Sequence, residues 1–387
     1  MGLIFYSILI LAIGFSGFYG WLIWHYQRAW QRLAPQELPP NYTGTTRFSI
    51  LVPARNEVLN IQECLDAILL QNYPAHQFEV IVLDDFSTDK TPNIVQNYSD
   101  DRVRLIQLSD HVDPENSKAF KKLGLTLGIQ QAQFEHIVTT DADCTMERQW
   151  LSQLAYAFEQ SDAVMLAAPV LFRPSNSVLG QFQQLDFMAM MGVNAAGIGL
   201  RWHYLGNGAN LAYSKKAFEA VEGFQGIDDL ASGDDLMLMQ KIGQQFPNQV
   251  QFVKSLAATT YTDVKPNWPG FMSQRIRWAT KTRAYPDKKV TILWALIWMY
   301  VTGMVICLAT GLFLDPNMLW ILLFMLCWKA FWDYRFLSQL AAFFDRKSLL
   351  APRSFLRSFF LENAYIFVIG ILGNVVKEYR WKGRKTR

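Results

Sequence analysis

Residues 136–144 read HIVTTDADC, a short apolar run followed at once by two aspartates one residue apart. The run predicts a buried strand over His136–Val138. Asp141 and Asp143 can point the same way from an extended backbone, and their hard oxygens suit a divalent cation that also bridges phosphate oxygens. An isolated pair of this kind is more often a turn or a helix cap, so its place after a buried strand is what favours metal binding.

Three further apolar runs of strand length lie upstream, and polar loops and helical patterns follow them. The runs are Phe48–Val52, Phe78–Leu83 and Val103–Gln107, and an amphipathic helix through about Leu70 follows the first. This alternation predicts an α/β fold with a largely parallel sheet. Ligands of such sheets bind beyond the carboxyl ends of the strands, which is where the polar clusters fall.

Polar residues follow the first two strands directly. Residues 53–57 read PARNE after the first strand. Asp84 and Asp85 end the second, where a carboxylate can accept hydrogen bonds from a nucleotide base or ribose, although helix capping explains them equally well. Ser87 or Thr88 is expected to cap the helix that follows.

A second pair of acids, Asp234 and Asp235, precedes an apolar helical pattern that begins at Leu236. Two explanations stay open at this point. Paired acids at a helix N-terminus can be simple partners of the helix dipole. One of them can instead be a general base that takes a proton from a hydroxyl group.

Residues 274–278 read QRIRW on a predicted helix that starts near Trp268. Gln274, Arg277 and Trp278 are spaced i, i+3, i+4 and therefore share one helix face. Such an Arg can fork onto diphosphate oxygens, and such a Trp offers an aromatic wall to a sugar or an acceptor. The alternative is a helix whose Arg and Trp sit at a membrane interface.

Both ends of the chain carry long apolar segments. Leu3–Trp24 has no charged residue and is long enough to cross a bilayer, and Val290–Leu314 is a second such span. Arg28 and Arg32 follow the first span, so the positive-inside rule places the domain beyond it in the cytoplasm. We expect an N-terminal transmembrane helix in 1–27, a linker in 28–46, a catalytic domain in 47–287, and membrane helices with a basic tail in 288–387.

The C-terminal topology has two solutions. A third apolar run starts at Met318, is interrupted by Lys329, Asp333 and Arg335, and is followed by a last run over Phe359–Val376. If all three C-terminal runs cross, the basic tail lies outside; if one is interfacial, the tail lies inside. The intramembrane charges either face a partner or polar cavity, or snorkel to the interface.

Charge and cysteine content exclude other classes of protein. The net charge of +3 is too small to indicate nucleic-acid binding, and no basic helix stands out in the central region. The four cysteines are widely spaced without a paired metal-ligand pattern. We expect reduced thiols, consistent with a domain that faces the cytoplasm.

Taken together and in this order, these motifs resemble the family 2 glycosyltransferases with the GT-A fold, in particular the integral-membrane members. The similarity covers roughly Phe48 to Tyr285 and the flanking spans. It implies a nucleotide-diphospho-sugar transferase domain with a mostly parallel central sheet and transmembrane helices at both ends. The donor-binding residues that it implies are Pro53, Ala54, Arg55, Glu57, Asp84, Asp85, Lys121, Asp141, Gln274, Arg277 and Trp278.

Some positions depart from the family pattern. Phe86 stands where Gly is usual, so the resemblance does not determine the backbone conformation at this position. Lys121 falls at the spacing of a lysine that lies near the nucleotide phosphates in the family, but Gly124 and Thr126 replace the usual Ala and Asn after it. Asp234 replaces the Glu that often precedes the catalytic base in the family.

The resemblance also implies the chemistry. Asp141 and Asp143 match a pair that binds Mg2+ or Mn2+, and Asp235, next to Asp234, aligns with the catalytic base of an inverting transfer. The implied acceptor-binding residues are Gly208, Ala209, Asn210 and Trp278. The donor by family default is a uridine diphosphate sugar.

The acceptor is either a lipid or a growing polysaccharide. Few spans follow the catalytic domain, which favours a lipid at the cytoplasmic face of a bacterial inner membrane. The Gln-x-x-Arg-Trp signature argues for a processive polysaccharide synthase. A nucleotidyltransferase and an inactive membrane scaffold are the weaker alternatives from other classes.

Overall fold

The computed structural model describes residues 2–113, 119–228, 233–281, 284–285, 287–376, 379–381 and 384–386. The chain divides into two compact units. The helical unit comprises Met1–Arg32, Pro174–Ala196 and Val264–Lys377, and the α/β unit comprises Leu33–Arg173, Gly197–Asp263 and Glu378–Arg387.

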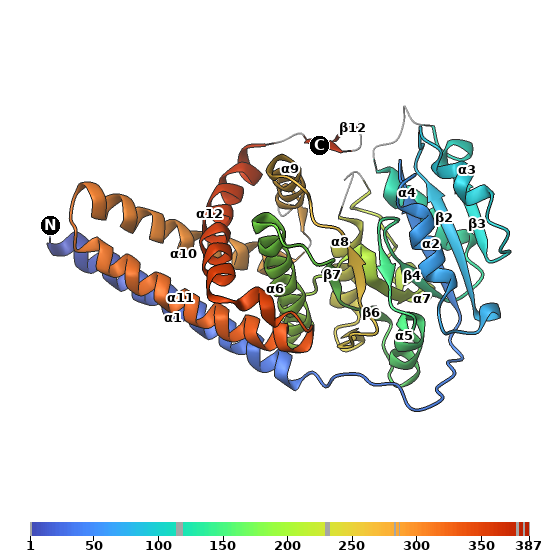
Figure 1. Cartoon of the computed structure of the whole chain (residues 1–387), viewed down its shortest axis with the longest axis horizontal. Helices are drawn as coiled ribbons and strands as arrows, with labels where there is room; N and C mark the ends of the chain where they lie inside the picture. The colour runs from blue at the N-terminus through green and yellow to red at the C-terminus, as the bar shows by residue number, and fades with distance from the viewer. Residues whose placement is uncertain are drawn as a thin grey trace. The chain divides into compact units, whose positions relative to one another are not determined.

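A seven-stranded sheet forms the centre of the α/β unit (Figure 1). Its order is β3-β2-β1-β4-β8-β6-β9, with bounds β1 Phe48–Ala54, β2 Phe78–Asp84, β3 Val103–Gln107, β4 His136–Thr139, β6 Met165–Ala167, β8 Leu211–Ser214 and β9 Val250–Phe252. Strands β1 to β4 pair in parallel, β6 pairs in parallel with β9, and β8 runs antiparallel to both β4 and β6. The predicted α/β fold with a largely parallel sheet is therefore confirmed.

Helices cover both faces of this sheet. The helices of the α/β unit are α2 Ile61–Leu69, α3 Thr91–Gln96, α4 Phe120–Gln131, α5 Trp150–Glu159, α7 Lys215–Ala220 and α8 Asp234–Gln245. Ile50 and Val52 of β1 point into one apolar core with residues of α2 and α5, including the buried Trp150. On the opposite face a Cβ at Gly128 of α4 would lie 3.2 Å from Leu51 Cδ2, so α4 packs closely there. Burial on both faces explains why β1 reads as a continuous apolar run.

Two small sheets complete the strands that the structure describes. β5 Thr145–Met146, β10 Thr260–Thr262 and β7 Val170–Phe172 form a three-stranded sheet in the order β5-β10-β7. β11 Tyr379–Trp381 and β12 Arg384–Thr386 pair antiparallel.

The segment between α1 (Gly2–Arg32) and β1 is bound to the surface of the α/β unit. The backbone amides of Thr45 and Thr46 donate to Glu159 Oε1 at 2.7 and 2.9 Å, and both hydroxyls donate to the same oxygen at 3.0 Å. The Tyr42 hydroxyl donates to Glu159 Oε2 at 2.6 Å. Nearer α1, Lys254 Nζ donates to the Leu33 carbonyl at 2.9 Å. The predicted linker thus has fixed contacts with the α/β unit.

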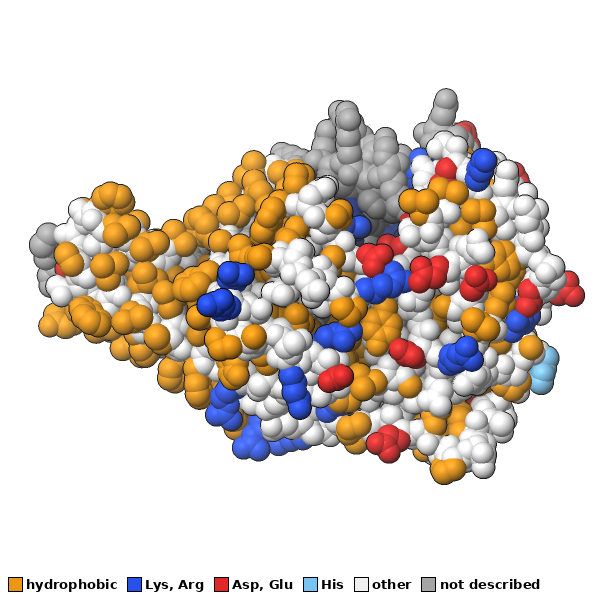
Figure 2. All heavy atoms as spheres, in the orientation of Figure 1, with side chains coloured by type: hydrophobic (Ala, Val, Ile, Leu, Met, Phe, Trp, Pro, Cys, Tyr) orange, Lys and Arg blue, Asp and Glu red, His pale blue; other side chains and the backbone are white. Residues whose placement is uncertain are grey.

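In the described part of the helical unit, three helices are long and apolar enough to cross a membrane. Its described helices include α1, most of α6 Val178–Leu200, α9 Trp268–Ala279, α10 Lys288–Phe313, α11 Met318–Phe343 and α12 Pro352–Val375. The three candidate spans are Phe5–Arg32, Lys288–Phe313 and Pro352–Val375. Figure 2 shows hydrophobic side chains covering most of the visible face around α1, α10 and α11. These helices suggest a membrane protein, in agreement with the apolar runs predicted at both ends.

The charges of α11 have partners within the helical unit. Lys329 is fully buried, and its Nζ lies 2.6 Å from Asp333 Oδ2 and 3.6 Å from Glu362 Oε1. The Tyr19 hydroxyl donates to Asp333 Oδ1. The Arg335 guanidinium instead lies over aromatic rings of its own helix. Of the two explanations for these charges, a protein partner is the one that the structure shows for Lys329 and Asp333.

Candidate functional site

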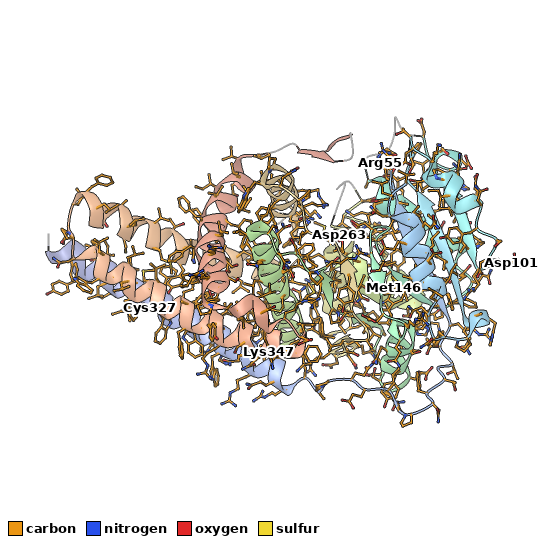
Figure 3. All side chains as sticks on the ribbon, in the orientation of Figure 1. Arg55, Asp101, Met146, Asp263, Cys327 and Lys347 are labelled. Atoms are coloured by element: carbon orange, nitrogen blue, oxygen red, sulfur yellow. The ribbon has the colours of Figure 1, made fainter. Side chains whose placement is uncertain are left out.

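Arg55 joins the loops that follow β1 and β2 at the carboxyl edge of the sheet (Figure 3). Its Nη1 donates to the carbonyls of Asp85 and Phe86 at 2.5 and 2.9 Å, and lies 3.9 Å from Asp85 Oδ1. Because one guanidinium nitrogen holds two successive carbonyls, Arg55 fixes the path of the second loop. The structure therefore brings the two predicted nucleotide-binding segments together.

Further hydrogen bonds join the same two loops. The Asn56 amide donates to Ser87 Oγ at 2.9 Å, and the Thr88 amide donates to Asn56 Oδ1 at 2.8 Å. The prediction that Ser87 or Thr88 caps the next helix is wrong, because α3 starts at Thr91 and neither side chain accepts from its first turn. Their hydrogen-bonding groups are engaged by Asn56 instead.

Asp84 is a buried carboxylate at the end of β2. Its Oδ2 accepts from the Ser87 amide at 3.2 Å, whereas its Oδ1 is buried and has no hydrogen-bond partner in the described part of the chain. Burial raises the pKa of Asp84 above its ordinary value. An orphaned carboxylate oxygen is ready to accept from a ligand N–H or O–H, which fits the predicted donor-binding role.

Phe86 adopts the conformation that a glycine would favour. Its φ is 52°, in the left-handed region, where a bulky side chain is strained. Its ring packs edge-to-face against Phe120, with centroids 5.5 Å apart. The departure from the usual Gly thus leaves a left-handed backbone in place and adds a contact to α4.

Asp141 and Asp143 lie in the turn that follows β4. The Cys144 amide donates to the Asp141 carbonyl at 3.1 Å, which closes the turn. The Asp141 side chain is 40% exposed, so a ligand can reach it. Among the described residues no group of three His, Cys, Asp or Glu could hold a metal by itself. Two hard carboxylates fit a Mg2+ or Mn2+ ion that takes its remaining ligands from phosphate and water.

Lys121 connects this turn to the second pair of acids. Its Nζ lies 3.1 Å from Asp141 Oδ1 and 3.3 Å from Asp234 Oδ2. Burial disfavours the charge of Lys121, but the neighbouring carboxylates of Asp141 and Asp234 outweigh burial and raise its pKa above the ordinary value. The predicted metal pair and the predicted catalytic pair therefore meet at one lysine.

Asp235 is held by two backbone amides. Its Oδ2 accepts from the Gly208 amide at 2.9 Å, and its Oδ1 accepts from the Leu236 amide at 2.8 Å. Both Asp234 and Asp235 lie in the first turn of α8, where the helix dipole favours negative charge. A Cβ at Gly208 would lie 3.2 Å from Asp235 Cβ, so a larger residue here would press on the Asp235 side chain.

The predicted acceptor segment packs against the sheet. Ala209 is buried, and its amide donates to Asn207 Oδ1 at 3.0 Å. Asn210 is buried as well: its Oδ1 accepts from Trp150 Nε1, and its Nδ2 donates to the carbonyls of Pro169 and Ala258, each at 2.8 Å. These bonds join the Asn210 side chain to three other parts of the α/β unit. Its contact with an acceptor stays a prediction.

Gln274, Arg277 and Trp278 lie on α9, in the helical unit, as the predicted helix requires. Gln274 Oε1 is buried without a hydrogen-bond partner, and Arg277 forms no ion pair with any described residue. Trp278 packs against Phe187, with ring centroids 6.1 Å apart. The role of these three residues at a donor stays a prediction.

Sequence reasoning missed the residue that anchors α9. Arg275 is buried, forms an ion pair with Asp186 of α6, and lies over the Trp278 ring at 4.4 Å. It falls between the motif positions, and its partner is 89 residues away in the chain. In the sequence, the one sign of this role is that Arg275 shares a helix face with the aromatic residues Phe271 and Trp278.

Comparisons with known proteins agree with this geometry. Residues 49–219 match the model described as Glycosyl transferase family 2, and residues 136–344 match the model described as Glycosyl transferase family group 2. A probable glycosyltransferase of Bacillus subtilis, YdaM, is 26% identical over 62% of this chain and 56% of its own length. Beta-monoglucosyldiacylglycerol synthase of Nostoc is 31% identical over 33% of this chain and 26% of its own length. The chain thus spans about half or less of these curated relatives.

One solved structure resembles nearly the whole chain. Mannosyltransferase PcManGT from Pyrobaculum calidifontis, in complex with GDP-Man and Mn2+, matches with a TM-score of 0.56 at 21% identity, over 96% of this chain and 100% of that one. At this level of identity the likeness shows the fold alone. The predicted GT-A-like fold is confirmed.

Proposed function

This chain belongs to glycosyltransferase family 2, and we propose that it transfers a sugar from a nucleotide-sugar donor, with inversion, to a lipid acceptor. The donor that we propose is a uridine diphosphate sugar, the family default. We propose that the transfer takes place at the cytoplasmic face of a membrane, because Arg28 and Arg32 lie at the end of the first apolar helix that leads into the α/β unit.

A single observation supports this proposal most directly. Lys121 bridges Asp141 and Asp234 at 3.1 and 3.3 Å, so the candidate cation ligands and the candidate base share one side of the α/β unit. A transferase needs both at one place, because the leaving group and the incoming hydroxyl flank the same anomeric carbon. Had these acids lain on opposite sides of the sheet, the proposal would have had no basis.

The donor would bind across the loops that Arg55 holds together. The orphaned Asp84 Oδ1 would accept a hydrogen bond from the base or ribose, and Asp85 and Glu57 lie on the same two loops. A bound Mg2+ or Mn2+ on Asp141 and Asp143 would neutralise charge on the departing diphosphate. Lys121 would supply a further positive charge beside it.

Asp235 is the proposed general base. The Gly208 and Leu236 amides fix its carboxylate, and each oxygen keeps a lone pair for the acceptor hydroxyl. Asp235 would take the hydroxyl proton as the acceptor oxygen attacks the anomeric carbon and the nucleotide diphosphate leaves. No covalent sugar intermediate is needed in this scheme.

A lipid acceptor agrees with the apolar ends of the chain. Among the described residues, three candidate spans flank the α/β unit in the sequence, and Arg28 and Arg32 lie at the C-terminal end of the first, Phe5–Arg32. One relative is named as a synthase of a glucosylated diacylglycerol, although it aligns with only a third of this chain. We propose a bacterial inner membrane as the location.

The test combines lipid analysis with a defined variant. Lipid extracts from cells with and without the chain are compared by mass spectrometry, and a hexosylated lipid is expected only in cells that carry it. Asp235→Asn should abolish that product while the purified variant still binds nucleotide, and the exposed Asp162→Asn is the matched control. Sugar incorporation into a polymer instead of a lipid would overturn the proposed acceptor, and an unchanged Asp235→Asn product would overturn the proposed base.

A further inference from the structure

Lys121 is held between acids from two different elements. Lys121 belongs to α4, Asp141 to the turn after β4, and Asp234 to the first turn of α8. Asp235 adds a further favourable electrostatic interaction with Lys121. Within the described residues, this ammonium is thus the ion-pair partner of a candidate cation ligand and of a residue next to the candidate base.

A divalent cation and Lys121 would compete for Asp141. A bound cation needs a carboxylate oxygen at roughly 2.0–2.6 Å. Lys121 Nζ lies 3.1 Å from Asp141 Oδ1, so the two positive charges would stand within a few ångströms of each other. Like charges at that range repel strongly in a partly buried site. The ion pair therefore opposes binding of a cation alone.

A nucleoside diphosphate changes this balance. Its phosphates bring negative charge that offsets the charge of the cation, and they offer Lys121 new acceptors. Asp234, 3.3 Å from Lys121, is a partner that the lysine can keep when Asp141 turns toward a cation. Lys121 can therefore release Asp141 at little loss once phosphate is present.

We propose that Lys121 couples the two ligands of the site: by pairing with Asp141 it keeps cation affinity low until a nucleoside diphosphate is bound. This inference rests on the proposed function, because it takes Asp141 as a cation ligand. It makes Lys121 a positioning residue that sets the order of binding, in addition to any contact with phosphate. Coupling of this kind is reciprocal, so the cation must tighten nucleotide binding by the same factor.

Lys122, the next residue in the chain, does not pair with Asp141 as Lys121 does. Lys122 is buried, and its Nζ donates to the Ile227 carbonyl. Lys216 of α7 is exposed and follows β8 near the start of β4, away from the carboxyl edge of β1. Removing the Lys216 charge is therefore the matched control for removing the Lys121 charge.

The experiment measures Mn2+ binding by the full chain in detergent, from the electron paramagnetic resonance signal of free Mn2+. Titrations are run without nucleotide and with saturating UDP or GDP, whichever binds in direct titration, and the Mn2+ that the nucleotide chelates in solution is measured without protein and subtracted. For wild type, nucleotide should tighten Mn2+ binding by about tenfold or more, within the usual range of coupling. Lys121→Met should bind Mn2+ without nucleotide at least about fivefold more tightly than wild type, with a smaller effect of nucleotide. Lys216→Met should behave as wild type.

Two further variants separate coupling from damage to the fold. Lys121→Arg keeps a cation between the acids and should keep Mn2+ binding weak without nucleotide. Asp141→Asn in the Lys121→Met background should remove the gained binding, which ties the signal to this site. If Lys121→Met gains no Mn2+ affinity while wild type binds Mn2+ with nucleotide, the coupling is wrong and the proposed function stands. If no Mn2+ binds under any condition, the cation site fails and the coupling fails with it.

Discussion

Asp84, Asp141 and Asp235 carry the same side chain, and their surroundings give them different capacities. Asp84 is buried with one orphaned oxygen, Asp141 is partly exposed beside Lys121, and Asp235 accepts two backbone hydrogen bonds. The sequence predicted all three as site residues from their places after strands or at a helix start. It could not predict the contacts, because Lys121 and Gly208 lie 20 and 27 residues from the acids that they touch.

Asp84→Asn should stabilise the protein and weaken nucleotide binding. Burial raises the Asp84 pKa, so the folded state holds this proton more tightly than the unfolded chain, and the charged carboxylate destabilises the fold above that raised pKa. Removing the charge should raise Tm at pH 7.5 by a few degrees, for a gain of about 1 kcal/mol. Nucleotide affinity should fall, since an amide replaces the oxygen that would accept from the ligand.

The pH dependence gives this prediction its sign. Wild type should gain stability relative to Asp84→Asn as the pH falls through the raised pKa, because protonation removes the buried charge. Tm measured by tryptophan fluorescence from pH 8 to pH 5, together with UDP or GDP titrations, checks both parts. A variant that is less stable at pH 7.5 and binds nucleotide as well as wild type would contradict the argument.

Gly208→Ala should slow catalysis without weakening nucleotide binding. The new Cβ would lie 3.2 Å from Asp235 Cβ and 3.4 Å from Oδ2, so the carboxylate must shift by a few tenths of an ångström. Small displacements of a catalytic group reduce rates steeply, and we expect kcat to fall about tenfold. Sugar transfer and nucleotide Kd are the measurements. Gly17→Ala, where a Cβ would meet nothing within 4 Å, is the control, and an equal fall there would remove the argument.

At the scale of elements, β1 to β4 were predicted well, whereas β6, β8 and β9 were missed. The predicted run Val103–Gln107 matches β3, and the other three runs end within two residues of β1, β2 and β4. β6, β8 and β9 have three or four residues each, too few for a periodic pattern. The antiparallel course of β8 depends on pairing with β4, which a local pattern does not contain.

The helix pair α11 and α12 offers a test of the buried charges. Lys329→Met would leave Asp333 and Glu362 without their cation, and we expect a loss of about 3 kcal/mol or more in thermal or denaturant unfolding in detergent. Lys329→Met/Asp333→Asn should recover much of that loss, because the substituted amide is neutral and can still accept from the Tyr19 hydroxyl.

Arg335→Gln is the control for this pair. Arg335 lies over the rings of Phe331 and Trp332, and such contacts contribute only about 0.5–1 kcal/mol. A Lys329→Met variant as stable as Arg335→Gln would show that the buried ion pair does not stabilise the helices. If Lys329→Met/Asp333→Asn were less stable than Lys329→Met, the unpaired charge of Asp333 would not be the cause of the lost stability.

For the molecule as a whole, the chain enters the α/β unit from α1 and leaves it toward α10 and α12, so candidate spans lie on both sides of it in the sequence. Composition predicted this arrangement, because apolar runs are visible without knowledge of contacts. The fixed linker was not predicted, since its contacts with Glu159 join residues more than 110 positions apart. Because these contacts protect the linker, cleavage within it can be used to test which helices anchor the chain in a membrane.

Glu159→Gln should expose the linker to proteolysis without releasing the α/β unit from membranes. Glu159 accepts bonds from Tyr42, Thr45 and Thr46, and hydrogen bonds from these groups hold its pKa below the ordinary value despite partial burial. A neutral Gln accepts more weakly, so chymotrypsin should cleave after Tyr42 several-fold faster in the variant at pH 7.5. A depressed pKa means that the Glu159 contribution is present above the ordinary glutamate pKa and is lost as the pH falls through the folded value, so the difference should shrink toward pH 4.

The fate of the fragments decides how the chain is anchored. After cleavage at Tyr42 the larger fragment keeps the candidate spans Lys288–Phe313 and Pro352–Val375, and it should remain in the membrane pellet after an alkaline carbonate wash. The smaller fragment keeps Phe5–Arg32 and should pellet too. Release of the larger fragment would show that the C-terminal helices do not hold the enzyme in the bilayer. The lipid acceptor would then lose its structural support, because only one span would tie the α/β unit to its substrate.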